Sequence, residues 1–162
     1  MHCSAHRSLL ATVGTLAALT AVATTAQAKL ADADKKVLTE LALQWAIEGG
    51  ISDFKLVKDP SHLVVANFNL PKQVELAVPG RTVVVLSLLR IQAEADFRGD
   101  FLYFRFNRFK GDDQKAEVAI ALVWAVSVKS TTQYLSGGGA TLNFEKHDGK
   151  WQLQPVMNRW MS

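Results

Sequence analysis

Apolar residues recur at every third or fourth position from Ala31 to Glu48, the spacing that places side chains on one face of a helix. The stripe consists of Val37, Leu41 and Trp45, with Leu38 and Ala42 beside them. Asp32 and Asp34 lie where acidic side chains stabilise a helix start, and Gly49-Gly50 matches a helix end. The pattern predicts an amphipathic helix over residues 31–48.

Beyond residue 60 the sequence changes to alternating and β-branched segments, which are typical of strands. Strands are expected over residues 62–70, 81–86, 100–109, 115–129, 141–146 and 150–156, and the first two should pair. The last two are joined by His147-Asp148-Gly149, and Asp-Gly favours a tight hairpin turn. Ser87 is a suitable cap for a short helix that ends near Ala95.

This order of elements predicts an α+β fold, in which a curved antiparallel sheet packs on an N-terminal helix and a short second helix. The element order and the closing segment Phe-Glu-Lys-His-Asp-Gly-Lys-Trp, residues 144–151, resemble the nuclear transport factor 2-like superfamily. That superfamily includes steroid isomerases, so the resemblance implies a conical sheet around a cavity. The chain departs from it at residues 51–57, which are strand-like where the family usually has further helices. A cystatin-like sheet around one helix is the alternative fold.

The first 28 residues have the composition of a secretory signal peptide. Arg7 precedes an uncharged run, and Ala26-Gln27-Ala28 offers small residues at the two positions that signal peptidase reads. We expect cleavage after Ala28, which leaves a single domain over residues 29–162. Cys3 would leave with the signal, so the mature chain would form no disulfide. These features predict a periplasmic or secreted bacterial protein.

Charge and motifs argue against several classes of function. Lys and Arg number 18 against 15 Asp and Glu and are scattered, whereas nucleic-acid binding and membrane anchoring need concentrated basic patches. We therefore expect neither nucleic acid nor, after cleavage, a membrane as partner. His62 and His147 are far apart, and Asp112-Asp113 lacks the spaced oxygen ligands of a calcium loop. No metal site and no cofactor is expected.

The densest polar cluster covers residues 94–100, with Tyr103 and Arg105 just after it. A carboxylate in an apolar cavity can have a raised pKa and act as a base, with a tyrosine stabilising the oxyanion. The resemblance to steroid isomerases makes Asp96 or Asp100 with Tyr103 the candidates for such chemistry. The competing interpretation is a solvated connection between helix and strand, which leaves no residue assigned as catalytic.

Aromatic side chains with a polar group are also typical of ligand cavities and interfaces. The candidate ligand-binding residues are Trp45, Asp96, Tyr103, Arg105, Trp124 and Tyr134. We expect an exported, non-catalytic binding module that holds an apolar small molecule or a protein partner. A small lyase or isomerase and an accessory structural subunit are the alternatives.

Residues 101–109 and 115–129 carry apolar side chains on both faces of the expected sheet. A face open to water would be polar, so both faces should be covered. In a domain of this size we expect helices to cover only one face. The other face would meet a second subunit or the C-terminal segment around Trp160, which predicts a homodimer through the sheet face.

Overall fold

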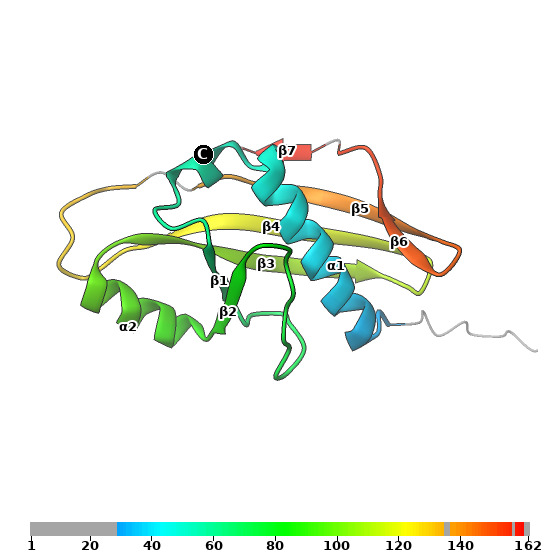
Figure 1. Cartoon of the computed structure of the whole chain (residues 1–162), viewed down its shortest axis with the longest axis horizontal. Coiled ribbons are helices and arrows are strands. Elements are labelled where there is room, and N and C mark those ends of the chain that lie inside the picture. Colours follow the sequence, from blue (N-terminus) through cyan, green and yellow to red (C-terminus); the bar gives the residue numbers. More distant parts are fainter. Residues whose placement is uncertain (1–28, 135–136, 157, 161–162) are drawn as a thin grey trace, which may run out of the picture.

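A computed structural model describes residues 29–134, 137–156 and 158–160. It shows an α+β fold in which two helices pack on a strongly curled, mixed sheet (Figure 1). The predicted α+β class is thus confirmed. The predicted signal peptide, residues 1–28, lies outside the described residues.

The strands follow the order β2-β1-β3-β4-β5-β6 across the sheet, and β7 also pairs with β5. Their bounds are β1 His62–Ala66, β2 Thr82–Leu86, β3 Phe101–Gly111, β4 Lys115–Ala125, β5 Gly139–His147, β6 Lys150–Leu153 and β7 Asn158–Trp160. Strands β3 to β6 form the predicted antiparallel meander, and β1 pairs with β2 as expected. However, β1 runs parallel to both β2 and β3, so the prediction of a purely antiparallel sheet is wrong. The reason is that residues 67–81 return the chain to the start of β1, where Thr82 N–H donates to the Ser61 carbonyl.

The first helix, α1, spans Asp32–Trp45 and lies diagonally across one face of the sheet (Figure 1). Its buried side chains are Leu38, Thr39, Ala42 and Leu43. Val37 is 40% exposed, so the buried face is centred one residue later than the sequence pattern indicates.

After α1 the backbone widens into a π turn over Ala46–Gly50, where Gly49 has a φ of 103° that favours glycine. The next segment, Ser52–Leu56, is a 3-10 helix, so the expectation of a strand there is wrong. Phe54 stacks on Phe104 with ring centroids 6.0 Å apart, and this contact holds the segment against the sheet.

The main core lies between α1 and the sheet. It contains Phe104, Phe106 and Phe144, each no more than 1% exposed, together with Leu38 and Leu43 of α1. Burial of large apolar side chains is the dominant stabilising contribution in such a domain.

Asp34 joins α1 to the hairpin of β5 and β6. Its carboxylate accepts hydrogen bonds from Lys146 Nζ at 2.8 Å and from Trp151 Nε1 at 2.7 Å. Partial burial acts to raise the pKa of Asp34, but these two donors outweigh it and leave the pKa below its ordinary value. The predicted turn of this hairpin is confirmed, since Asp148 and Gly149 both have positive φ, 49° and 75°.

The second helix, α2, spans Leu88–Arg98 and is capped by Ser87 as predicted. Ile91 and Ala95 of this helix pack with Tyr103 and Ala125 on the sheet face opposite α1. Helices therefore cover parts of both faces, and the expectation that they cover only one is wrong. The reason is that α2 connects β2 to β3, and therefore crosses over β1, which lies between them.

The rest of the second face leaves little apolar surface for a sheet-face dimer. Ala121 pairs with Gly139, and the Trp160 indole lies so close to Gly139 that a Cβ there would come within 2.5 Å of the ring. Further along, the face is charged, with Arg108 paired to Glu117. Trp160 therefore covers the part of this face beside Gly139, and the homodimer through the sheet face stays a prediction.

Candidate functional site

The six candidate binding residues are not brought together. Tyr103 is 7% exposed and lies beneath α2. Arg105 follows on the same face but is held by its neighbour, since its Nε donates to Asn107 Oδ1 at 2.7 Å. Trp45 lies at the end of α1, where Arg159 sits 5.3 Å from its ring centroid.

Trp124 and Tyr134 do form a pair, with stacked rings 4.0 Å apart. Trp124 packs against the main core, so the stack fastens the segment after β4 to the sheet. A hydrogen bond with the Asp100 carboxylate raises the pKa of the Tyr134 hydroxyl. This pair is thus tied to the polar cluster at the end of α2.

Asp96 and Asp100 hold the segment that follows β4. Asp100 accepts from Ser127 N–H at 2.7 Å and from Ser130 Oγ at 2.6 Å. Asp96 accepts from Val128 N–H at 2.8 Å. The Ser130 hydroxyl lowers the pKa of Asp100, and the Val128 N–H lowers the pKa of Asp96. A general base near neutral pH needs a raised carboxyl pKa, so both residues are poorly suited to that role.

These two carboxylates should make the fold sensitive to acid. A carboxyl with a folded pKa below its ordinary 3.8 stabilises the fold above that pH, and the contribution is lost as pH falls through the folded pKa. We expect Asp100→Asn to lower the free energy of unfolding at neutral pH and to flatten its decline below about pH 4. Urea unfolding at several pH values measures both.

The control for this experiment is Asp113→Asn, because Asp113 is exposed in the turn between β3 and β4. This variant removes an exposed carboxylate and should change the free energy of unfolding at neutral pH by less than about 0.5 kcal/mol. If the free energy of unfolding had the same pH dependence in the wild type and in Asp100→Asn, the contacts of Asp100 would not favour its ionised form.

A groove of 530 Å³ lies between α2 and the paired strands β1 and β2. Its floor is apolar, formed by Val64 of β1, Val84 and Leu86 of β2, and Phe101 at the start of β3. Val64 and Val84 are directly opposite each other in the register, so they point to the same face. Val84 remains 40% exposed at this floor.

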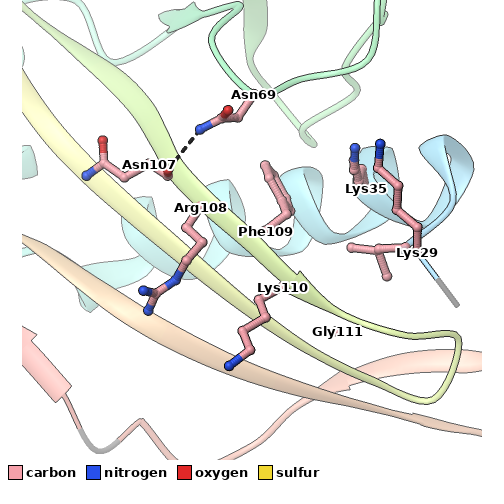
Figure 2. A pocket seen from close by; sticks show the side chains of 9 residues that line it. Lys29, Lys35, Asn69, Asn107, Arg108, Phe109, Lys110 and Gly111 are labelled. Atoms are coloured by element: carbon pink, nitrogen blue, oxygen red, sulfur yellow. Dashed lines mark hydrogen bonds between the residues drawn. The ribbon is translucent and has the colours of Figure 1, made fainter. Parts of the chain in front are cut away.

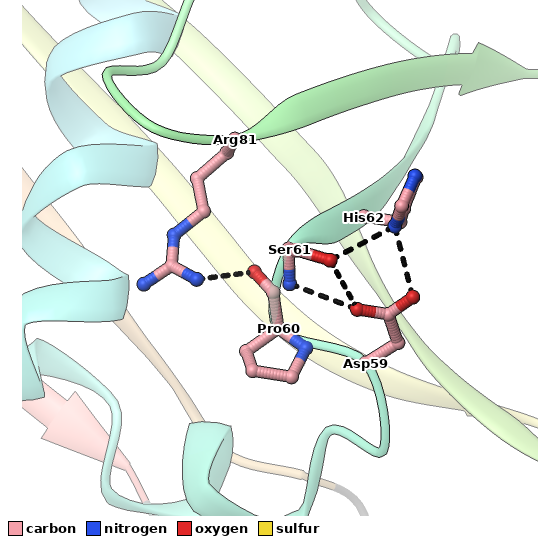
Figure 3. Close-up of polar contacts among 5 residues, drawn as sticks. All are labelled: Asp59, Pro60, Ser61, His62 and Arg81. Carbon is pink, nitrogen blue, oxygen red and sulfur yellow. Dashed lines mark hydrogen bonds and ion pairs between the residues drawn. The ribbon is translucent and has the colours of Figure 1, made fainter.

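Charged side chains form the rim of the groove, and most of them are paired. Glu94 lies 3.5 Å from Arg98, whose guanidinium covers the Phe101 ring at 4.7 Å. Asp59 accepts from His62 Nδ1 at 2.8 Å and from Ser61 Oγ at 2.5 Å (Figure 3). The Ser61 hydroxyl is the main cause of the lowered pKa of Asp59.

When His62 is neutral, its contact with Asp59 determines which of the two ring nitrogens carries the proton. A carboxylate only accepts hydrogen bonds, so the proton lies on Nδ1 and leaves Nε2 as an acceptor. Figure 3 shows Nε2 pointing away from Asp59. In the same view Arg81 donates a hydrogen bond to the Pro60 carbonyl, which holds the segment before β1 in place.

A second cavity, of 440 Å³, lies beside the start of α1 and is lined by several cations (Figure 2). These cations do not converge, because Arg108 and Lys110 extend away from Lys29 and Lys35. Arg108 is also paired with Glu117. The cavity therefore lacks the arrangement that would hold one anion.

Sequence reasoning missed the groove. The available signal was the run Val83-Val84-Val85, which places apolar side chains on both faces of a short strand. The structure was needed to show that α2 lies beside this strand and that a groove remains between the helix and the strand.

The chain matches no protein-family model, no curated protein and no solved structure. Within the described ranges, no helix is long and apolar enough to cross a membrane. In the same part of the chain, no three His, Cys, Asp or Glu side chains are close enough to hold a metal ion. Function therefore has to follow from the geometry of this chain alone.

Proposed function

We propose that this chain is an exported, non-catalytic binding module, and that the groove between α2 and the β1–β2 pair holds an apolar small molecule. The observation that carries this proposal is the apolar floor of Val64, Val84 and Leu86, which is open to solvent in a groove of 530 Å³. Ligand sites typically have volumes of about 300–1,000 Å³, with mainly apolar walls and a few polar groups.

Most charges on the rim are paired, which favours a ligand with little net charge; Lys58, which also lines the groove, adds one cation. Glu94 and Arg98 neutralise each other, and Asp59 is bound to His62. Asp100, also on the rim, is occupied by two serines. In the neutral form of His62, Nε2 is an acceptor that can orient a ligand carrying a hydroxyl or amide N–H.

A nuclear transport factor 2-like architecture is part of the proposal, and a cystatin-like sheet is its alternative. The antiparallel meander of β3 to β6 and the helix α1 across the curled sheet support the first. The parallel pairing of β1 with β2 is the feature that departs from a simple meander.

The alternative functions have less support. A lyase or isomerase based on Asp96 or Asp100 with Tyr103 would need a carboxylate free to accept a proton, and both carboxylates bind the segment after β4. An accessory structural subunit would leave the apolar groove without a role.

Binding of N-phenyl-1-naphthylamine, a neutral apolar probe whose fluorescence rises in apolar surroundings, tests the proposal. We expect Val84→Asp to weaken probe binding at least about tenfold, because it places a charge on the floor of the groove. Val37→Asp is a matched control, since Val37 and Val84 are each 40% exposed. Equal affinity of the wild type and Val84→Asp would contradict the proposed site.

A further inference from the structure

Strand β2 lies at one edge of the sheet, and β1 is the strand with which it pairs. Two hydrogen bonds of 2.8 Å show how β2 is turned. At its start, Thr82 N–H donates to the Ser61 carbonyl, and at its end the Leu86 carbonyl accepts from Asn67 N–H. Because alternate residues of a strand bond to the same neighbour, the even-numbered residues of β2 direct their backbone groups toward β1.

Val83 and Val85 therefore direct their backbone N–H and C=O groups away from β1. Within the part of the chain that the structure describes, these four groups have no hydrogen-bond partner. Unpaired groups along an edge strand form a template for another strand, because an extended backbone offers donors and acceptors at the same spacing. The hydrogen-bonding pattern of this edge thus specifies an extended backbone as its partner.

The composition of β2 points to its own copy as that partner. Soluble proteins usually keep edge strands from pairing with themselves by placing Lys or Pro there, or a bulge. The opposite edge, β6, begins with Lys150 and is followed by Pro155. By contrast, β2 reads Thr-Val-Val-Val-Leu, without charge, proline or irregular pairing to β1. Two copies of such a β-branched strand stabilise each other through cross-strand pairs.

We propose that β2 pairs antiparallel with β2 of a second copy of this chain, about a two-fold axis that passes through Val84 perpendicular to the sheet. In this register Val83 lies opposite the partner's Val85, and the two residues exchange both of their N–H···O=C hydrogen bonds. The symmetry repeats this pair on the other side of the axis. All four outward groups of each chain are then satisfied, and the two sheets join edge to edge.

Other registers leave some of these groups without a suitable partner. A shift of one residue would set the outward groups opposite groups that already bond to β1. A shift of two residues would pair Val85 with the partner's Arg81, or Val83 with the partner's Ser87. The Arg81 N–H already donates within its own chain, and the Ser87 carbonyl already accepts the first hydrogen bond of α2. The axis at Val84 is therefore the register that the backbone favours.

Side chains are compatible with this register on both faces of the joined sheet. On the face of the groove, Val84, which is 40% exposed, stands directly opposite the partner's Val84. On the same face Thr82, also exposed, stands opposite the partner's Leu86. On the other face lie Val83 and Val85, which are half-buried against the main core. The pairing thus covers apolar surface as well as backbone groups.

No like charges meet at this edge. Arg81 is the only charged residue within three positions of β2 in the sequence. It lies opposite the partner's Ser87, and the two copies of Arg81 stand about 20 Å apart along the strands. Its guanidinium is also directed to the Pro60 carbonyl, beside the start of β1 (Figure 3).

Cysteine cross-linking tests the position of the axis. In a Cys3→Ser background the chain has no other cysteine, so Val84→Cys introduces a single thiol. The two Val84 Cα atoms would lie about 4.5 Å apart, within reach of a disulfide, and we expect a cross-linked dimer on mild oxidation. Thr82→Cys is the control, because this residue is also exposed but its two copies would stand about 13 Å apart.

Sedimentation velocity over a micromolar concentration series tests the dimer itself. We expect the wild type to dimerise and Val85→Pro to raise the dissociation constant at least about tenfold, because proline removes an outward N–H from each chain. The ladder to β1 is kept, since it does not use this N–H. Leu153→Pro on β6 is the matched control. Gln154 N–H bonds to β5, so Leu153 N–H points away from the sheet, and its loss should leave the dimer unchanged.

Three results would overturn the proposal. The first is a monomeric wild type, including one that binds an unrelated extended peptide at β2. The second is a dimer that forms equally well in Val85→Pro, with circular dichroism showing that this variant is folded. The third is a dimer in which Val84→Cys does not cross-link, which would assign the interface to another surface such as the sheet face. This last measurement decides the question even where Val85→Pro fails to fold.

Discussion

Replacing Phe106 with alanine is expected to lower the free energy of unfolding by about 3–5 kcal/mol. Phe106 is fully buried in the main core and stacks on Phe109 with ring centroids 5.5 Å apart. Its removal would forfeit the burial of a large ring and leave a cavity that neighbouring strands cannot close. Urea unfolding followed by circular dichroism measures the change.

The control for this substitution is Phe97→Ala, which deletes the same ring from a position that is 91% exposed. Its effect should stay within about 0.5 kcal/mol. A similar loss in both variants would mean that the sheet face beneath α1 is not the main core.

Gly111→Ala is expected to destabilise the fold by about 2–4 kcal/mol. Gly111 ends β3 with a φ of 139°, which favours glycine. A Cβ at this position would come within 2.1 Å of the Lys115 carbonyl oxygen. That oxygen accepts the Asp112 N–H that closes the hairpin, so it cannot move without loss of this bond.

Gly80→Ala is the control that separates the steric clash of a Cβ at Gly111 from the backbone strain of a positive φ. Gly80 also has positive φ, 68°, but a Cβ there would meet nothing within 4 Å. This variant should lose only about 1 kcal/mol, the ordinary cost of a side chain in that conformation. Thermal unfolding of both variants measures the difference, and equal losses would rule out a steric role for the Lys115 carbonyl.

Local chemistry made much of this fold predictable. The spacing around Leu38 and Ala42 indicated α1, Ser87 marked the start of α2, and Asp148-Gly149 marked the last hairpin. Each of these signals acts between residues close in sequence. The direction of β2 was not predictable in this way, because it depends on the path of residues 67–81.

The site was less predictable than the fold. Tyr103 and Arg105 were correctly placed on a strand, but nothing local showed that α2 would cover Tyr103. Asp96 and Asp100 were recognised as a polar cluster. Their partners, Ser127 and Val128, lie about 30 residues further along the chain, beyond the reach of any local pattern.

Methyl-resolved NMR, with N-phenyl-1-naphthylamine added in steps, tests the proposed binding groove most directly. Occupation of the groove should shift the methyl resonances of Val64, Val84 and Leu86, which form its floor. The resonances of Leu142, fully buried in the main core, should stay where they are. Shifts confined to the core around Leu142, with the three floor residues unchanged, would contradict the assignment of this groove as the binding site.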